Sequence, residues 1–366
     1  MFNNVYRGKR VLVTGNTGFK GSWLSLWLKK LGADVIGISK DVPTTPSMFE
    51  SLGLTEQVLH HTADVRDYTR CCDLILGSRP DFIFHLAAQP IVSASYQNPL
   101  ETISSNVLGT AHILEAMRHL KNYCIAVIVT SDKAYDNVEQ VWGYKETDAL
   151  GGKDIYSGSK GAAEIIVRSY IKSFFLGSGF NGAVGVARAG NVIGGGDWAK
   201  DRIVVDCMRS WSEGVPVSIR HPNATRPWQH VLEPLSGYLQ LGAQLAADAK
   251  LNGEAFNFGP RADQDCTVET LLRDLSCYWG FADASEAYAI IPSPAFHEAG
   301  LLKLNCDKAL SCLKWKACLD YGEMVRFTSS WYFAYYKEKG DMLKFTYDQI
   351  AEFEVKARDQ QLAWTA

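Results

Sequence analysis

The stretch that decides the fold is residues 10–21, which reads RVLVTGNTGFKG. A short β-branched run, Arg10–Thr14, leads into glycines at the spacing G-x-x-G-x-x-G, and a helical pattern of apolar residues follows directly. Because glycine has no Cβ atom, it allows a tight turn and lets the backbone approach a pyrophosphate at a helix N-terminus. The stretch therefore predicts a strand, a turn and a helix that together bind a dinucleotide. The residues expected to contact it here are Gly15, Thr17, Gly18, Phe19 and Gly21.

Strand-like runs recur through the first half of the chain, and most are separated by segments with apolar residues at helical spacing. The runs are Arg10–Thr14, Asp34–Ser39, Val58–Ala63, Phe82–Ala87, Ile125–Ser131 and Ala183–Ala187. Continuous apolar strands that alternate with helices predict a parallel sheet covered on both faces. Right-handed crossovers then give a doubly wound, Rossmann-like α/β fold.

The regular alternation ends near residue 190. Beyond it, the run Gly194–Gly196 and several prolines interrupt shorter elements, which is typical of a loop-rich α+β region. We predict a dinucleotide-binding domain with the catalytic residues at 1–190. Residues 191–366 are expected to form mainly a smaller α+β substrate-binding domain, whose chain crosses back to the first. The charged stretch 347–366 predicts a helix on the surface.

Composition argues against several classes of function. The 366 residues carry a formal net charge of −3 and no long basic run, so nucleic acid and anionic membranes are not expected as partners. No apolar stretch approaches the roughly 20 residues that cross a bilayer, and Met1–Arg10 does not resemble a secretory signal. The nine cysteines lack the C-x-x-C spacing of zinc sites, which favours reduced thiols, no metal and a cytoplasmic location.

The end of the second predicted strand bears on the choice of dinucleotide. Ser39 stands where an acidic residue usually holds the ribose hydroxyls, and Asp41 could take that role from slightly further along. Lys40 favours a 2′-phosphate instead, so NADP stays open beside NAD. After the third strand, Asp64 and its neighbour Val65 are expected to meet the adenine. The alternative role of Asp64 is to cap the next helix.

The fourth predicted strand ends in the segment His85–Gln89, which reads HLAAQ. The small side chains of Ala87 and Ala88 would let the backbone lie against a cofactor. His85 is interpreted as structural rather than catalytic.

A tyrosine and a lysine four residues apart open a later helix, in the segment YSGSK that runs from Tyr156 to Lys160. Residues at this spacing share one helix face, so the phenol and the ammonium project into the same space. The cation is expected to lower the pKa of the Tyr156 phenol toward neutral pH, which would make it a usable base. Ser131, after the fifth strand, could hydrogen-bond the same substrate hydroxyl. Together these residues predict an active site that oxidises an alcohol.

These motifs together resemble the extended short-chain dehydrogenases/reductases that act on nucleotide sugars, and the resemblance implies that Asn106, Tyr156 and Lys160 contact the cofactor. Five stretches are more specific and are similar to the CDP-glucose 4,6-dehydratase family. They are Ser131–Tyr135 (SDKAY), Trp142–Tyr144 (WGY), Leu150–Gly152 (LGG), Gly190–Trp198 (GNVIGGGDW) and Arg226–Val231 (RPWQHV). The resemblance extends over nearly the whole chain and is thinnest after about residue 260.

The resemblance implies an NAD-dependent lyase that converts CDP-glucose to a 4-keto-6-deoxy sugar and water, in deoxysugar synthesis for lipopolysaccharide O-antigens and other cell-surface polysaccharides. Tyr156, helped by Ser131 and Lys160, would take the 4-hydroxyl proton while hydride leaves C4. Asp132 and Lys133 stand where dehydratases carry an acid/base pair. We therefore expect Asp132 to protonate the leaving 6-hydroxyl and Lys133 to take the C5 proton. The residues expected to bind substrate are Gln89, Asn191, Arg202, Arg226 and His230.

Two other functions stay open at this point. A nucleotide-sugar 4-epimerase, or a dehydratase for another nucleotide hexose, would keep Tyr156 and Lys160. A non-catalytic dinucleotide sensor is disfavoured, because a pure binder needs no matched base and cation. Related enzymes pair two long helices per subunit, here roughly residues 98–120 and 156–175, and the second is unusually apolar. We therefore predict a homodimer or a tetramer.

Overall fold

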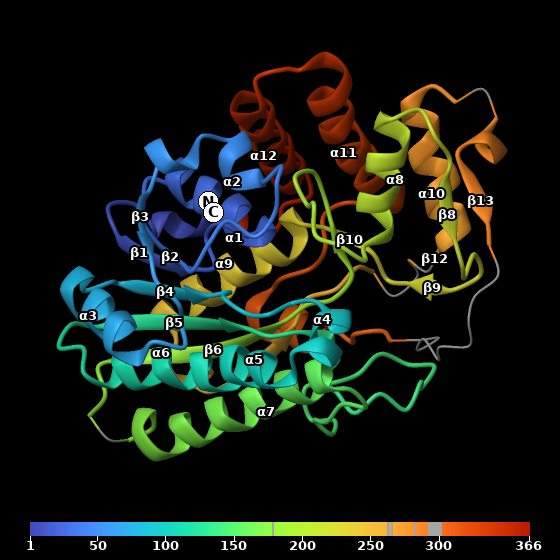
Figure 1. Ribbon diagram of the computed structural model, residues 1–366. Coiled ribbons are helices and arrows are strands. Elements are labelled where there is room, and N and C mark those ends of the chain that lie inside the picture. The colour runs from blue at the N-terminus through green and yellow to red at the C-terminus, as the bar shows by residue number, and fades with distance from the viewer. Residues whose placement is uncertain (178, 262–263, 265, 282, 292–301) are drawn as a thin grey trace.

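The first strand, β1 (Arg10–Thr14), lies within a seven-stranded parallel sheet in the computed structural model, which describes residues 1–177, 179–261, 264, 266–281, 283–291 and 302–366 (Figure 1). The strand order is β11-β6-β5-β4-β1-β2-β3, and each neighbouring pair is parallel. The other strands are β2 (Asp34–Ser39), β3 (Leu59–Thr62), β4 (Phe82–His85), β5 (Cys124–Val129), β6 (Gly182–Arg188) and β11 (Ala255–Asn257). All six predicted strands are present, with bounds that differ by a few residues, and the doubly wound fold is confirmed.

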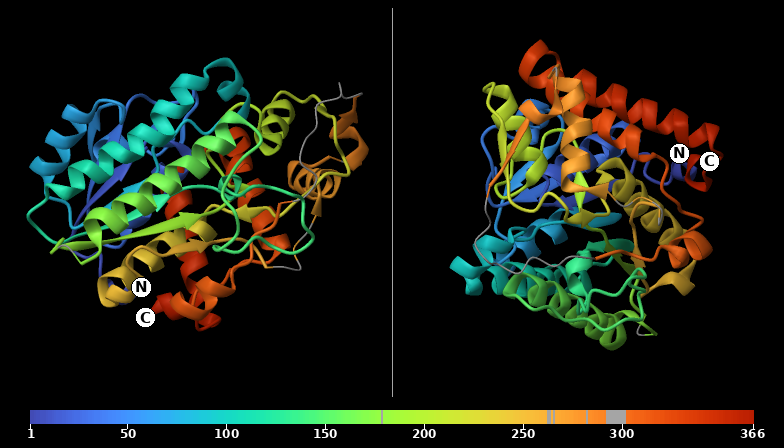
Figure 2. Two further views of the ribbon diagram at one scale, coloured as in Figure 1. Left: turned by 90° about the horizontal axis from the view of Figure 1, so that it is seen from below. Right: turned by 90° about the vertical axis from the view of Figure 1, so that its right-hand side faces the viewer.

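Alternate side chains of β1 serve two separate cores. Val11 and Val13 are buried in one hydrophobic cluster with Trp23 and Trp27, while Leu12 belongs to a second cluster on the other face. A strand buried on both faces needs apolar residues at every position, which is why β1 lacks polar alternation. Helices cover both faces of the sheet, with α6 and α7 along one side and the C-terminal helices on the other (Figure 2).

The helices that cover the sheet include those expected from the sequence. On the first face lie α3 (Tyr68–Ser78), α6 (Gly109–Arg118) and α7 (Ile155–Tyr170), and on the second lie α1 (Phe19–Lys30), α9 (Leu232–Ala247) and α12 (Met342–Asp359). The predicted helix over residues 98–120 consists of α5 (Pro99–Ile103), a π-helical segment (Ser104–Leu108) and α6. Helix α7 likewise continues into a π-helical segment, Ile171–Phe175. Such π segments are rare and occur often at functional sites.

The second half of the chain both returns to the first sheet and adds small elements of its own. Strand β11 joins the edge of the large sheet beside β6, and α12 contacts α1. Within the described residues, three two-stranded sheets and short helices make up the rest, among them α8 (Ile203–Ser212), β8 (Val217–Ile219), α10 (Val268–Ser276), β13 (Tyr288–Ile290) and α11 (Tyr321–Phe333). The predicted division of the chain at residue 190, with a second domain whose chain crosses back to the first, stays a prediction.

The C-terminal helix α12 is amphipathic rather than fully exposed. Its side chains Ile350 and Phe353 are buried, and Glu354 accepts a hydrogen bond of 2.9 Å from the indole nitrogen of Trp27. Other charged residues of the helix, among them Asp348, Glu352 and Arg358, are exposed on its outer face. In the part of the chain that the structure describes, no helix has the length and apolar character needed to span a membrane.

Candidate active site

The glycine turn after β1 is closely packed against its neighbours. Gly15 has φ +74°, in the left-handed region, and a Cβ atom there would lie 2.9 Å from the amide nitrogen of Ala87. A Cβ atom on Gly21 would lie 2.0 Å from the carbonyl oxygen of Gly15. Both positions therefore require glycine, and the spacing recognised in the sequence reflects the close approach of turn, helix and strand.

The N-terminus of α1 fits a pyrophosphate. Gly18 is the N-cap residue, no side chain caps the helix, and no acidic residue lies in its first turn. The first amide N–H groups of a helix have no partner within the helix, and their partial positive charge favours an anion. The residues of the turn are therefore suited to the diphosphate of a dinucleotide.

Ser39 supports this turn from the end of β2. Its hydroxyl accepts a hydrogen bond from the Thr17 amide (3.2 Å) and donates one to Asn16 Oδ1 (2.9 Å). The Thr17 hydroxyl donates to the Asp41 carbonyl oxygen (2.7 Å). Ser39 is thus buried and fixes the turn, and its predicted contact with a ribose hydroxyl remains a prediction.

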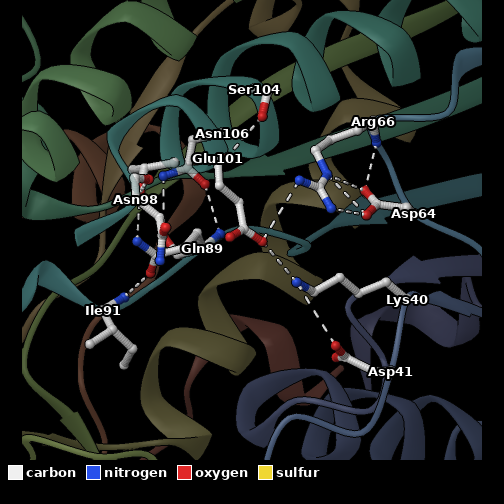
Figure 3. A network of polar contacts seen from close by, with 11 residues as sticks. Lys40, Asp41, Asp64, Arg66, Gln89, Ile91, Asn98, Glu101, Ser104 and Asn106 are labelled. Atoms are coloured by element: carbon white, nitrogen blue, oxygen red, sulfur yellow. Dashed lines mark hydrogen bonds and ion pairs between the residues drawn. The ribbon is translucent and has the colours of Figure 1, made fainter. Parts of the chain in front are cut away.

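A network of charged side chains lies where the adenosine half of a dinucleotide is expected (Figure 3). Arg66 binds Asp64 through both carboxylate oxygens and lies 3.7 Å from Glu101 of α5. Glu101 also accepts a hydrogen bond of 3.2 Å from Lys40, which lies 3.8 Å from Asp41. Three carboxylates and two cations thus converge from α5 and from the segments that follow β2 and β3.

The alternative role of Asp64 as a helix cap is wrong. The N-cap residue of α3 is Asp67, whose side chain accepts a hydrogen bond from the Arg70 amide. The Asp64 carboxylate instead binds Arg66, and this contact holds the pKa of Asp64 below its ordinary value. The adjacent Val65 is buried against Gly109.

Asn106 and Gln89 hold each other in place at the π-helical segment (Figure 3). Asn106 Oδ1 accepts from the Gln89 amide (2.8 Å), and Asn106 Nδ2 donates to the Gln89 carbonyl oxygen (3.1 Å) and to Ser159 Oγ (2.8 Å). The Gln89 side chain donates to Thr102 and accepts from the Ile91 amide. Both predicted ligand contacts stay predictions, and in this structure the two side chains position the backbone after β4.

His85, the last residue of β4, has the surroundings of a structural residue. Its Nδ1 lies 2.7 Å from Thr14 Oγ1 and its Nε2 lies 3.1 Å from Thr110 Oγ1, and burial lowers its pKa to about 3. A buried neutral imidazole between two hydroxyls agrees with a structural role. Ala87 and Ala88 follow as half-buried residues, and the Ala87 amide donates to Thr14 Oγ1 (3.2 Å).

The predicted catalytic residues come together at the carboxyl end of β5. Ser131 and Asp132 follow this strand, and the Ser131 hydroxyl donates to Asp132 Oδ1 (2.8 Å). Tyr156 and Lys160 come from the first turns of α7, and the Lys160 ammonium lies 5.9 Å from the centre of the Tyr156 ring. A side-chain hydrogen bond joins Tyr156 to Ser131. The spacing in sequence thus corresponds to one cluster in space.

The expected lowering of the tyrosine pKa is wrong for this structure. Burial raises the pKa of the Tyr156 phenol to about 12, and the charge of Asp132 adds to the rise, although the Ser131 hydrogen bond and Arg202 oppose it. Burial also lowers the pKa of the Lys160 ammonium to about 8, while the charge of Glu164 raises it. The spacing alone could not predict that desolvation of the buried phenol would dominate its pKa.

Asp132 lies deep in the cluster and faces Asn191. Its side chain is 4% exposed, and its Oδ2 atom lies 3.5 Å from Asn191 Nδ2. A Cβ atom on Gly190 would lie 2.0 Å from Asp132 Oδ2, so glycine is required there to make room for the carboxylate. Lys133 is half-buried beside it, and its amide donates to Ser131 Oγ (3.2 Å).

A cavity of about 450 Å³ opens beside Asn191. Asn191, Arg202 and Arg226 line it, and Trp228 is a further lining residue. The predicted contacts of the first three with a nucleotide sugar stay predictions. Arg202 lies 3.3 Å from Asp197 in an ion pair. A cavity with cationic side chains and a buried aromatic ring is suited to an anionic ligand with an aromatic base.

His230 and Gln89 are absent from the described lining of this cavity. His230 is buried between Trp23 and Phe327, at ring distances of 5.8 and 5.3 Å, and burial lowers its pKa to about 3. Its predicted substrate contact stays a prediction, which this placement does not favour.

Two groups near the cluster were missed in the sequence. Lys20, in the first turn of α1, is half-buried, and burial together with Arg202 lowers its pKa to about 8, while Asp132 raises it. A lysine within a glycine turn for a pyrophosphate is the signal that could have revealed it. The second group is the buried pair of Glu164 and Arg188, which only the folded chain brings together.

Comparison with known proteins gives three kinds of relative. The family model described as GDP-mannose 4,6 dehydratase matches residues 12–181. The CDP-glucose 4,6-dehydratase of Salmonella typhimurium is 45% identical and aligns over 96% of this chain and 97% of its own length. The CDP-paratose 2-epimerase of Salmonella typhi is 29% identical over 74% of this chain and 84% of its own. A UDP-glucose-4-epimerase structure from Stenotrophomonas maltophila with bound NAD has a TM-score of 0.77 at 22% identity, covering 90% and 99% of the two chains.

Proposed function

The chain belongs to the nucleotide-sugar dehydratases of the extended short-chain dehydrogenase/reductase family, and we propose that it converts CDP-D-glucose to CDP-4-keto-6-deoxy-D-glucose and water. The observation that carries this proposal is the identity to a CDP-glucose 4,6-dehydratase over nearly the full length of both chains. A second observation supports it: Asp132 and Lys133 lie beside Ser131 and Tyr156. An epimerase has no need of this additional acid and base.

The proposed cofactor is NAD, which when bound accepts the hydride from C4 of the hexose and returns it to C6. The network of Figure 3 supports NAD over NADP. The cations Lys40 and Arg66, which could bind a 2′-phosphate, are already paired with Asp41, Asp64 and Glu101. Because three carboxylates face two cations, the group has an excess negative charge that opposes a further phosphate.

Tyr156 is the proposed base for the 4-hydroxyl. Its hydrogen bond with Ser131 stabilises the phenolate, and the Lys160 ammonium on the same helix face adds a positive charge. The high pKa of Tyr156 means that the phenol gives up its proton only when the site supplies further positive charge. The phenol must lose its proton before it can take the proton of the 4-hydroxyl, and the positive charges of Lys160 and of the oxidised nicotinamide, when NAD is bound, would favour this phenolate.

Asp132 and Lys133 are the proposed pair for the loss of water. The 4-keto group acidifies the C5 proton, which Lys133 takes in its neutral form, and Asp132 gives a proton to the 6-hydroxyl as it leaves. Asp132 is buried, and Ser131 and Asn191 fix both of its oxygen atoms. A buried carboxyl held from two sides can meet one defined oxygen atom of the sugar.

The diphosphate and base occupy the cavity in this proposal. Arg202 and Arg226 supply guanidinium groups for phosphate oxygens, and Asn191 supplies an amide donor beside Asp132. The hexose would then lie next to Asp132 and Tyr156.

Mass spectrometry of the product tests the function. The protein is incubated with CDP-glucose with and without added NAD, and loss of one water with formation of a 4-keto group is the expected result. An unchanged substrate would contradict CDP-glucose as the substrate and direct the search to other nucleotides. A product of unchanged mass with inverted C4 would identify a 4-epimerase.

The proposed assembly is a homodimer that could associate further to a tetramer. Apolar side chains on α5, the following π segment and α7 are exposed, with Leu100 at 79%, Leu108 at 51% and Ile165 at 54%. These helices lie along one face of the molecule (Figure 2). Exposed apolar area on a helix pair is typical of a surface that a second copy covers. Light scattering at micromolar concentration is expected to give at least a dimer mass, and a monomer would contradict this.

We also propose a cytoplasmic location and a role in deoxysugar synthesis for cell-surface polysaccharides such as the O-antigens of lipopolysaccharide. All nine cysteines are free, which is usual in a reducing compartment. Fractionation of the source cells with antibody detection tests the location.

A further inference from the structure

One end of the cavity is formed by the first turn of α8 and the end of β8, which are adjacent elements (Figure 1). Asp201, Arg202 and Asp206 line it from the helix side, and Ser218 and Arg220 from the strand side. Asn191, which contacts Asp132, lines the same cavity from a different element, the loop after β6. If the hexose lies at Asp132, the α8–β8 end is the part of the cavity available to the base.

The backbone of β8 offers hydrogen-bonding groups on this side. Val217 donates to the Ala287 carbonyl oxygen (3.0 Å), and the Ile219 carbonyl oxygen accepts from Ile291 (2.9 Å). Alternate residues of a strand bond to opposite sides, so the N–H and C=O groups of Ser218 face away from β13. In the described part of the chain β8 has a partner strand on one side only. Its second edge is therefore free to meet a ligand.

A strand edge alone does not distinguish the two common pyrimidines. Cytosine presents an amino donor beside a ring nitrogen acceptor, while uracil presents a carbonyl acceptor beside an N–H donor. A backbone that offers both N–H and C=O groups can pair with either base after a small shift. A group that only accepts hydrogen bonds would favour the amino group of cytosine and repel the carbonyl oxygen of uracil.

Three carboxylates line the cavity, and two of them are engaged. Asp197 lies 3.3 Å from Arg202 and accepts from the Ala199 amide, while Asp201 accepts from the Ser93 hydroxyl (2.5 Å). Asp206 makes no hydrogen bond or ion pair with any residue that the structure describes. Asp206 is exposed; its partial burial in the cavity wall and the charge of Asp201 raise its pKa, while the charges of Arg209 and Arg220 lower it. Asp206 is thus the acidic side chain left for a ligand.

We propose that Asp206 accepts a hydrogen bond from the exocyclic amino group of cytosine and thereby makes the site prefer cytidine over uridine nucleotides. This inference rests on the proposed function, since it requires a nucleotide sugar in the cavity. It gives a physical reason for discrimination between cytosine and uracil. Contacts of Arg202 and Arg226 with the diphosphate cannot provide it, because the diphosphate is the same in both nucleotides.

Binding of CDP and UDP to the NAD-loaded protein tests the inference by titration calorimetry. The wild type is expected to bind CDP at least tenfold more tightly than UDP, and Asp206→Asn is expected to lose about tenfold in CDP affinity. UDP should bind the variant as well as before or better, because the amide can donate to the uracil oxygen. With CDP-glucose, KM should rise while kcat changes by less than about twofold, which a misfolded variant would not show.

Asp201→Asn is the matched control, since it makes the same change in charge and shape within the same cavity lining. It is expected to leave the ratio of CDP to UDP affinity unchanged. A wild-type preference for CDP that survives in Asp206→Asn overturns the inference while the proposed function stands, and so does a wild type that binds both nucleotides equally. A wild type that binds neither nucleotide contradicts the proposed function itself, and the inference falls with it.

Discussion

The hydroxyl of Thr130 donates a hydrogen bond of 2.6 Å to Glu164, and this contact joins the strand end that carries Ser131 to the helix that carries Lys160. Glu164 also accepts from Arg188 Nε at 2.8 and 3.0 Å, and Arg188 Nη1 donates to Tyr135 (2.6 Å). Both partners of the ion pair are fully buried. The buried Glu164 carboxylate therefore helps to hold the strand end with Ser131 and the helix with Lys160 at a fixed distance from each other.

Replacing this carboxylate by an amide tests its structural role. Glu164→Gln leaves the Arg188 guanidinium buried without its counter-charge, so the free energy of unfolding is expected to fall by about 3 kcal/mol. Urea unfolding followed by circular dichroism measures it. The control is Glu352→Gln, which removes an exposed partner of Arg326 and is expected to cost less than about 1 kcal/mol. Equal losses in the two variants would contradict the special role of Glu164.

The local parts of this site could be predicted from sequence, whereas the parts that depend on burial could not. The glycine turn and the pair of Tyr156 and Lys160 are set by neighbours along the chain, so their spacing predicts their position. The pair of Glu164 and Arg188 joins residues 24 positions apart, and nothing in the local pattern indicates it. The pKa of Tyr156 was predicted with the wrong sign for the same reason, because spacing does not reveal desolvation.

Tyr156→Phe removes the proposed base and little else. Because the ring stays in place, NAD affinity is expected to change by less than about threefold, while kcat falls by about 10³-fold, within the range for loss of a general base. Stopped-flow absorbance of the reduced nicotinamide measures the rate of the chemical step, and titration calorimetry measures NAD affinity. A variant with near-normal turnover would exclude Tyr156 as the base.

The pH dependence of kcat/KM is expected to report Lys160. Its pKa is lowered to about 8, so the ammonium is present below pH 8 and is lost as pH rises through that value. Activity that depends on the cation should therefore fall above pH 8. In Lys160→Arg the guanidinium stays charged, so the decline should move to higher pH even if the maximal rate is lower.

Lys20, whose pKa is also lowered to about 8, is the competing source of such a decline. A decline that disappears in Lys20→Met but persists in Lys160→Arg would assign it to Lys20.

Lys20→Met also measures the electrostatic contribution of the first turn of α1. The ammonium lies beside the helix end that suits a pyrophosphate, and no ion pair in the described structure neutralises it. NAD affinity is expected to fall about tenfold, as for the loss of a hydrogen bond to a charged group. Lys29→Met, in the last turn of the same helix, is the control and should leave affinity unchanged. Equal affinities of the wild type and Lys20→Met would contradict the prediction.

The last prediction concerns Lys133 and separates loss of water from oxidation at C4. In deuterium oxide the wild type is expected to exchange the C5 proton of the sugar as it forms product. Lys133→Met should still reduce NAD in a single turnover, because Ser131, Tyr156 and Lys160 are intact, but C5 exchange should slow by at least about 10²-fold. Asp132→Asn is the complementary variant, in which C5 exchange should persist while loss of the 6-hydroxyl slows. NMR of the recovered sugar distinguishes the two patterns. Normal C5 exchange in Lys133→Met would exclude Lys133 as the base and leave it the task of ordering Asp132, with which it shares the hydrogen-bonded Ser131.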